Sequence, residues 1–249
     1  MEFELIIDSH THFGPSISMG IEVKTSELTS QMAESGISYA VIIPFPSTAI
    51  ASNEINVKVL EETRKVPTLI PYHYIREDFE REDFDPIPED YFGGKWHWMR
   101  GTQDFASNYS VLENKHLSSL IEKIRKTSKP ILFEEELRFT EIFVEMASGI
   151  NIIIPHLGLL GGNPIDFLKS FKDRENVYFD TSLASKDTIY EFVKKLGPER
   201  ILFASDIPFG RMRSELQKVI SLPLSIKEKE FILFKNFLRL TSFNPQKQI

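Results

Sequence analysis

Short apolar runs recur along the whole chain and alternate with longer polar segments. Eight of these runs are rich in Val, Ile, Phe and Tyr, and they occupy residues 3–7, 39–43, 68–74, 95–99, 130–133, 151–154, 177–179 and 201–204. Runs that are apolar at nearly every position are typical of strands in a parallel sheet whose two faces are both covered. The pattern therefore predicts eight strands.

The segments between these runs have the apolar spacing of amphipathic helices. The predicted helices cover residues 26–35, 53–65, 117–127, 140–147 and 185–196. Gly36 and Gly197 directly follow two of them, and Pro67, Pro130 and Pro198 come soon after helices, where these residue types end a helix. Eight strand–helix units of about 31 residues each fit a closed (β/α)8 TIM barrel formed by residues 1–249 as a single domain, and a doubly wound open sheet is the alternative.

Residues 75–92 depart from this pattern because they contain eight acids against only two arginines. In a barrel this segment follows the third strand on the face that carries active sites. We expect a solvated acidic loop, and a lid over a site is the alternative. Residues 101–114 form a second long connection, after the fourth strand.

Composition narrows the possible chemistry. The chain has 29 basic and 36 acidic residues, a formal net charge of −7, and no cysteine. Without cysteine there is no thiol nucleophile and no thiolate metal site, so His and carboxylates must hold any metal. The acidic balance argues against a nucleic-acid partner. No run reaches ~18 apolar residues, so we expect no membrane span and a cytoplasmic protein.

Residues that can bind a metal or transfer a proton stand where the predicted strands end. His10 and His12 are two residues apart, so on a strand they face the same side. Glu134, His156 and Asp206 follow three later runs. Because the carboxyl ends of barrel strands meet at one mouth, we expect these five side chains to form one site.

These motifs, in this order, resemble the amidohydrolase superfamily. The resemblance rests on His10-x-His12, on His156-Leu157-Gly158, and on the segments 177–182 and 201–208, and it extends to a closing helix at 231–240. It is greatest to the amidohydrolase-related branch, which comprises metal-dependent barrel hydrolases and decarboxylases. It covers nearly the whole chain and implies the same barrel.

The resemblance implies a role for each matching residue. His10 and His12 would be metal ligands, and Asp206 would be a ligand and the base that deprotonates the attacking water. His156 would be a ligand, or would polarise the substrate or shuttle a proton. Asp8 would orient the site. The structural alternatives are a helix N-cap for Asp206 and hydrogen-bonded structural roles for the histidines.

The chain departs from the family at two strands. Glu134 stands where the family usually has His after the fifth strand, and we expect it to be a ligand. The alternatives are that Glu135 or Glu136 points inward, or that all three form a solvated acidic turn. The fourth run has no Lys at the family's usual place, so a carbamylated lysine and a binuclear centre are not supported. Arg100, nearest the mouth on this strand, is a candidate contact for a substrate carboxylate or phosphate.

The predicted protein is a metal-dependent hydrolase acting on a small amide, lactone or other ester. A non-oxidative decarboxylase and a catalytically inactive, ligand-binding barrel are the alternatives. One zinc ion per chain is expected, with manganese or iron as alternatives because oxygen ligands favour them. The expected partner is a small-molecule substrate, and neither nucleic acid nor a membrane is expected as a partner. A homo-oligomer is possible.

Overall fold

Each of the eight apolar runs overlaps a strand of one curled sheet in the computed structural model, which describes residues 3–77, 84–101 and 106–247. The strands are β1 (Ile7–Ser16), β2 (Ile21–Val23), β3 (Tyr39–Pro44), β4 (Leu69–Tyr74), β5 (Gly93–Trp96), β6 (Ile131–Phe133), β7 (Ile152–Ile154), β8 (Val177–Asp180) and β9 (Ile201–Leu202). Their order is β2-β1-β3-β4-β5-β6-β7-β8-β9, and all neighbours are parallel except β1 and β2.

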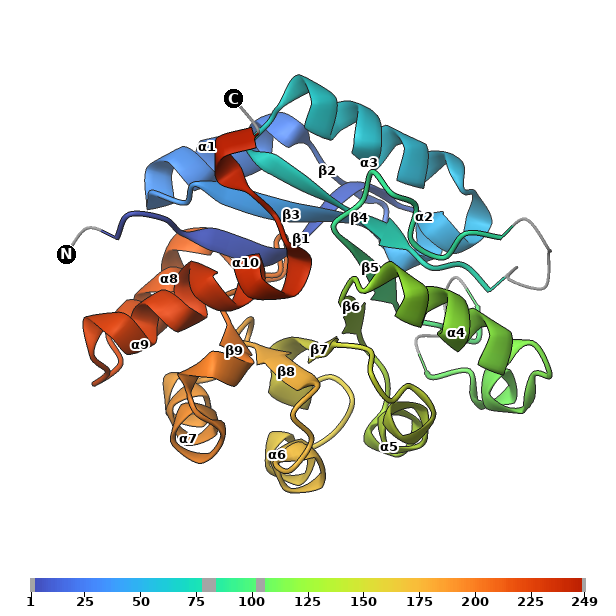
Figure 1. The fold of residues 1–249 in the computed structure, drawn as a ribbon. Coiled ribbons are helices and arrows are strands. Elements are labelled where there is room, and N and C mark those ends of the chain that lie inside the picture. Colours follow the sequence, from blue (N-terminus) through green and yellow to red (C-terminus); the bar gives the residue numbers. More distant parts are fainter. Residues whose placement is uncertain (1–2, 78–83, 102–105, 248–249) are drawn as a thin grey trace.

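The first strand and the segment after the last one close the sheet into a barrel. His12 N donates to Ile207 O at 2.9 Å, and Asp206 N donates to His10 O at 2.8 Å. Figure 1 shows the strands surrounded by helices. The predicted TIM barrel is confirmed.

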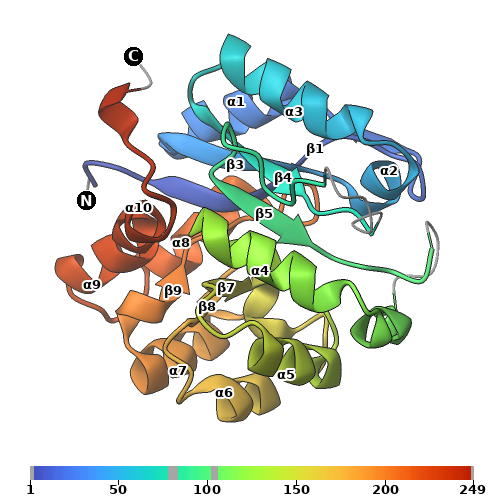
Figure 2. The same ribbon diagram turned by 45° about the vertical axis from the view of Figure 1, so that its right-hand side comes forward.

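The helices that follow the strands form the outer layer of the barrel, as Figure 2 also shows. They are α1 (Thr25–Ser35), α2 (Pro46–Ala51), α3 (Glu54–Lys65), α4 (Leu117–Thr127), α5 (Leu137–Met146), α6 (Pro164–Phe171), α7 (Lys186–Leu196), α8 (Met212–Ile220), α9 (Ile226–Glu230) and α10 (Asn236–Thr241). Short 3-10 turns are η1 (Tyr109–Glu113), η2 (Pro155–Gly158), η3 (Pro198–Arg200) and η5 (Pro245–Lys247), and η4 (Phe231–Lys235) is a π-helix that leads into α10. The five predicted helices are confirmed to within a few residues. No helix among these described residues is long and apolar enough to cross a membrane.

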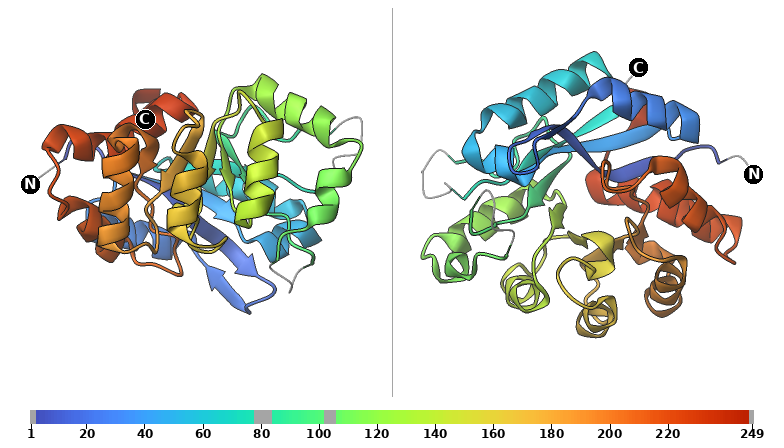
Figure 3. Two further views of the ribbon diagram at one scale, coloured as in Figure 1. Left: turned by 90° about the horizontal axis from the view of Figure 1, so that it is seen from below. Right: turned by 180° about the vertical axis from the view of Figure 1, so that it is seen from behind.

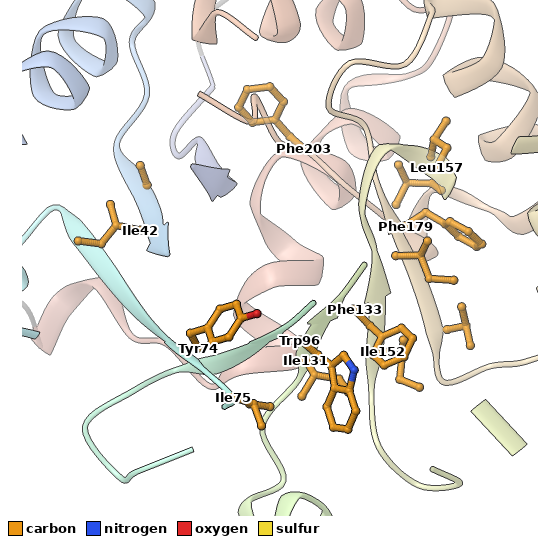
Figure 4. Packing of buried hydrophobic residues seen from close by; sticks show 14 of the residues in the cluster. Ile42, Tyr74, Ile75, Trp96, Ile131, Phe133, Ile152, Leu157, Phe179 and Phe203 are labelled. Atoms are coloured by element: carbon orange, nitrogen blue, oxygen red, sulfur yellow. The ribbon is translucent and has the colours of Figure 1, made fainter. Parts of the chain in front are cut away.

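Alternate strand residues face opposite sides of the sheet and build two apolar cores. On β6, Ile131 and Phe133 pack outward against the helices, and Leu132 faces the barrel interior. In the outer core, the Phe133 ring lies 5.5 Å from that of Trp96 and 4.3 Å from that of Phe143 on α5, and Figure 4 shows Phe133 beside Trp96. Burying each such side chain contributes about 1.5–3 kcal/mol.

The inner core fills only the amino-terminal end of the barrel. Phe237 and Leu240 of α10, together with Phe243, close this end and pack on inward residues such as Tyr72, whose ring lies 6.4 Å from that of Phe237. Phe243 also contacts Tyr39, the first residue of β3. The inward positions at the carboxyl ends of the strands are therefore left for polar side chains.

Two strand boundaries differ from the prediction. The first run was expected to end near Ile7, but β1 continues to Ser16 through buried polar residues and pairs with β2 in a hairpin, which projects from the barrel in Figure 3, left. The fourth strand was expected at 95–99, yet it occupies Gly93–Trp96. Gly93 and Gly94 form its start, and glycine is not typical of strands, so the apolar pattern does not include them. Position 93 requires glycine because a Cβ there would collide with the Tyr72 ring.

The acidic segment 75–92 is described only in part, since residues 78–83 lie outside the described residues. Its second half packs on the barrel and is not a solvated loop there. Ile87 and Tyr91 are buried, and the Tyr91 hydroxyl donates to Asn56 O at 2.8 Å. The alternative of a lid stays untested.

Candidate metal centre

The polar residues of β1 reach the barrel interior through an irregularity in the strand. The pairing of β1 with β3 shifts register between Asp8 and Thr11, as at a β-bulge. Ile7 belongs to the inner core, and beyond the irregularity His12 lines the cavity at the barrel mouth. His10 is fully buried, with its ring centroid 5.3 Å from that of His12.

Three side-chain atoms converge at the centre of this mouth. The Asp206 Oδ1 atom lies 3.3 Å from His10 Nε2 and 3.2 Å from His12 Nε2. Both His10 Nε2 and Asp206 Oδ1 are buried without a hydrogen-bond partner. Burial lowers the pKa of His10, and that of His12 to about 3, so both imidazoles are neutral at neutral pH. Neutral imidazoles are the form that binds a metal ion.

The hydrogen bond on the far side of His10 assigns its tautomer. His10 Nδ1 lies 3.0 Å from the Asp180 Oδ2 atom. An ionised carboxylate only accepts, so Nδ1 carries the hydrogen and Nε2 presents a lone pair to Asp206. Two acceptors facing each other in a buried site repel unless a cation lies between them. A carboxylate behind a ligating histidine is the usual arrangement at metal sites, so these residues fit a divalent ion.

Asp180 is the residue that holds the site together. Its carboxylate accepts from His10 Nδ1, from His156 N at 2.9 Å, from Ser182 N at 3.0 Å and from the Ser182 hydroxyl. Burial would raise the pKa of Asp180, but the His10 hydrogen bond and neighbouring charges lower it to about 2. The sequence motifs give Asp180 no role, although its position directly after the apolar run 177–179 is a signal for one.

His156 lies beside this centre with one ring nitrogen fixed. Its Nδ1 is 2.8 Å from the Ser182 hydroxyl oxygen, whose own hydrogen goes to Asp180, so Nδ1 is the donor. His156 Nε2 lies 3.8 Å from Asp206 Oδ2 and 3.8 Å from Glu134 Oε1. His156 has the rare left-handed backbone conformation, with φ 56°, and so does Asp206, with φ 56°.

Lys95 belongs to the site, contrary to the expectation that the fourth strand carries no Lys at the mouth. Its side chain is fully buried, and its Nζ contacts Glu134 Oε2. The fourth strand was expected to end near Arg100, but it ends at Trp96, so Lys95 takes the inward position near the carboxyl end. Arg100 lies exposed beyond the strand and is not among the described residues that line the cavity. Its contact with a substrate stays a prediction.

The three consecutive glutamates differ in their surroundings. Glu134 is the one whose side chain faces the histidines, and burial would raise its pKa, but Lys95 and the neighbouring histidines hold that pKa well below its usual value. Glu135 Oε1 accepts from Trp98 N at 2.6 Å, and Glu136 Oε2 accepts from the Tyr109 hydroxyl at 2.9 Å. Among the described residues, two groups of possible ligands have donor atoms within 4.8 Å of one another: His10, His12 and Asp206, and His10, His156 and Asp180. Glu134 belongs to neither group, so its ligand role stays a prediction.

Two further groups support the centre from outside. Asp8 Oδ1 accepts from Ser205 N at 2.9 Å and from His10 N at 3.3 Å, which ties β1 to the segment carrying Asp206. Burial raises the pKa of Asp8 to about 7. His97 Nδ1 donates to Glu134 O at 2.6 Å. His73 takes no part in the site, because its Nδ1 donates to Pro86 O at 2.8 Å.

A cavity of about 620 Å³ opens above the centre. His12, His97, Glu134, His156 and Asp206 line its floor and walls, together with aromatic and aliphatic side chains. The Phe45 ring stacks on His12 with 4.6 Å between centroids. A pocket of this size with a few convergent polar groups suits a small molecule.

Comparison with known proteins gives similarity of fold without close similarity of sequence. No family model matches the chain, and no curated protein matches it. The solved structures that match include 2,6-dihydroxybenzoate decarboxylase from Rhizobium, with a TM-score of 0.74 at 15% identity over 96% of this chain and 99% of that one.

Two hydrolase-type structures match equally well. A putative 2-pyrone-4,6-dicarboxylic acid hydrolase from Pseudomonas putida has a TM-score of 0.73 at 18% identity, over 98% of this chain and 99% of that one. An amidohydrolase from Burkholderia multivorans with bound zinc has a TM-score of 0.76 at 12% identity, over 96% of this chain and 100% of that one. The chain thus has the barrel fold of these enzymes, in agreement with the amidohydrolase superfamily that its motifs resemble.

Proposed function

We propose that this chain is a metal-dependent hydrolase of the amidohydrolase type, acting on a small amide, lactone or other ester. The observation that carries the proposal is the convergence of His10 Nε2, His12 Nε2 and Asp206 Oδ1, where two buried acceptors face each other 3.3 Å apart. A cation between these two atoms would resolve that arrangement while Asp180 holds the hydrogen on the other nitrogen of His10.

His10, His12 and Asp206 would hold the ion, with His156 beside them. A divalent ion there would supply Lewis acidity, which polarises a substrate oxygen and makes a coordinated water more acidic. Zinc is the ion we propose, since it favours imidazole and carboxylate ligands, and manganese or iron would also fit. We propose one ion per chain, because Lys95 already balances the charge of Glu134.

Asp206 is the proposed base. Its Oδ1 points to the histidines, and Oδ2 lies 3.8 Å from His156 Nε2. Burial raises the pKa of Asp206 to about 6 in the metal-free chain, and a bound divalent ion would lower it, which favours the ionised form that accepts a proton. In this mechanism Asp206 Oδ2 removes a proton from the attacking water and then protonates the leaving atom. His156 presents a lone pair at Nε2 and is the second proton acceptor.

A non-oxidative decarboxylase is the second candidate. Its support is that some structural neighbours carry that activity in their names, such as 2,6-dihydroxybenzoate decarboxylase and 5-carboxyvanillate decarboxylase. Asp206 would then protonate the carbon that loses CO2. We also propose a small-molecule substrate and a cytoplasmic location. We propose that the chain binds no nucleic acid, and its net charge of −7 supports this.

The deciding experiment is elemental analysis together with turnover. We expect about one divalent ion per chain in the wild-type protein and its loss in a His10→Ala, His12→Ala double variant. His116→Ala, which changes a histidine before α4 and outside the cluster, is the matched control. Hydrolysis of an ester and lactone panel should be abolished by Asp206→Asn. Loss of CO2 from aromatic acids in place of hydrolysis would select the decarboxylase, and no metal binding after soaking with zinc, manganese and iron would leave a ligand-binding barrel.

A further inference from the structure

The walls of the cavity carry a one-sided charge. Four acidic residues line it, Asp206, Glu134, Glu135 and Glu136, and no Lys or Arg is among its described lining residues. Burial raises the pKa of Glu135 to about 8, so Glu135 is largely uncharged at neutral pH. The buried cation nearest to them, Lys95, is engaged by Glu134 and does not line the cavity. A second anionic group on a substrate would therefore meet negative charge on the described part of the wall.

Glu136 is the member of this group that stands apart from the metal centre. It is the N-cap residue directly before α5, its backbone N donates to the Ser107 hydroxyl at 2.9 Å, and its Oε2 accepts from the Tyr109 hydroxyl at 2.9 Å. The Tyr109 bond holds the carboxylate, and no ion pair or hydrogen bond among the described residues joins Glu136 to Asp206 or to a histidine. Its charge is thus fixed where the distal part of a substrate would lie.

The rim of the same cavity is apolar and exposed. Met19 is 38% exposed, Leu160 is 60% exposed and Phe209 is 50% exposed, and all three line the cavity from different segments of the chain. The Phe209 ring also meets His12 edge-on, 5.7 Å between centroids. Large apolar side chains are left exposed together most often where they meet a ligand or partner.

We infer that the site takes an uncharged carbonyl compound with an apolar or aromatic body and discriminates against one that bears a second, free carboxylate. Glu136 is the residue that sets this discrimination. The inference rests on the proposed function for the reacting group and adds the chemistry of the rest of the substrate. Like charges placed together in a partly desolvated pocket are an effective way to reject a competitor, and a substrate ammonium group at the same place would be tolerated.

Binding of a matched series to the zinc-loaded protein tests the inference without turnover. The probes are phenylacetohydroxamic acid and its para-carboxylate and para-aminomethyl derivatives, whose hydroxamate group binds zinc. We expect the carboxylate to bind at least tenfold more weakly than the parent compound, and the aminomethyl compound to bind equally well or better. Calorimetric titration measures the three dissociation constants. Equal or tighter binding of the carboxylate, or no binding of any probe, would overturn the inference.

Charge variants locate the effect. Glu136→Gln should reduce the ratio between the dissociation constants of the carboxylate and the parent compound at least threefold, and Glu136→Lys should bring this gap in affinity to zero. Glu141→Lys makes the same change of charge on α5 outside this cavity and should leave the gap unchanged. If Glu136→Lys acts no differently from Glu141→Lys, Glu136 does not set the discrimination.

The outcomes separate this inference from the proposed function. Hydrolysis of neutral esters and of their carboxylated analogues is measured on the same protein. The expected order of binding without any hydrolysis would overturn the proposed hydrolase and leave the inferred selectivity standing. Hydrolysis with a preference for the carboxylated analogue would support the hydrolase and overturn the inference.

Discussion

His10 Nε2 and Asp206 Oδ1 lie 3.3 Å apart, both are buried without a hydrogen-bond partner, and Asp180 fixes the His10 hydrogen on Nδ1. One atom belongs to the first strand and the other to the segment after the last strand, so their approach also closes the barrel. A cation between them would join the two ends of the sheet and stabilise the folded chain.

The first prediction follows from this linkage. Zinc at about 100 times its dissociation constant should stabilise the fold by about 2.7 kcal/mol. For a chain of this size the melting temperature should then rise by roughly 5–10 °C. Differential scanning calorimetry with and without a chelator measures the shift. His10→Ala with His12→Ala should abolish the shift and His116→Ala should preserve it, whereas a double variant that still shows the full shift would place the ion elsewhere.

The second prediction concerns Asp180. An Asp180→Asn side chain keeps the shape of the carboxylate but loses the charge that fixes the His10 tautomer, so zinc affinity should fall about 10- to 100-fold. Competition with a chromophoric chelator measures the dissociation constant. Asp187→Asn, in the first turn of α7, is the matched control. Unchanged affinity in Asp180→Asn would mean that the tautomer of His10 is set by some other group.

The third prediction concerns the pair between Lys95 and Glu134. Lys95 is fully buried, and the Glu134 side chain is 17% exposed, so Lys95→Met leaves a largely buried carboxylate without its partner. Loss of one partner of such a pair costs about 3 kcal/mol or more, and replacement of both partners costs much less. Urea unfolding of the metal-free protein should show this loss for Lys95→Met and its recovery when Glu134→Gln is added. Additive losses in the double variant would show that the two residues are energetically independent.

The fourth prediction is a dependence of stability on pH that arises from His73. Burial lowers the pKa of His73 to about 4, from 6.5 for the unfolded chain. Between these values the unfolded chain binds more protons, so the contribution of His73 is fully present above pH 6.5 and is lost as the pH falls toward 4. The expected loss is about 3 kcal/mol, from 1.36 kcal/mol per pKa unit.

The measurement is the free energy of unfolding of the metal-free protein at pH 7 and at pH 4.5. Since His10 and His12 also have lowered pKa values, the relevant quantity is the difference between the wild type and His73→Gln. The variant should lose less stability on acidification than the wild type. Parallel pH profiles for the two proteins would contradict the assignment to His73.

The periodicity of the chain was sufficient to predict the barrel and most of its candidate site. Each apolar run overlaps a strand, and His10, His12, His156 and Asp206, named from their positions at strand ends, come together at the mouth. This succeeds because strand and helix spacing is local, and because parallel strands necessarily bring their carboxyl ends to the same side of the barrel.

Only the tertiary structure decided which polar side chains face one another. Gly93 and Gly94 hid the start of β5, so the spacing favoured Arg100 over Lys95 as the charged residue at the mouth. The ion pair of Glu134 and the hydrogen bonds of Asp180 to the two histidines join residues that lie in or directly after different strands, between 24 and 170 positions apart in the sequence. Such pairings depend on the register between neighbouring strands, and a shift of one residue turns a side chain from the interior of the barrel to its outer face.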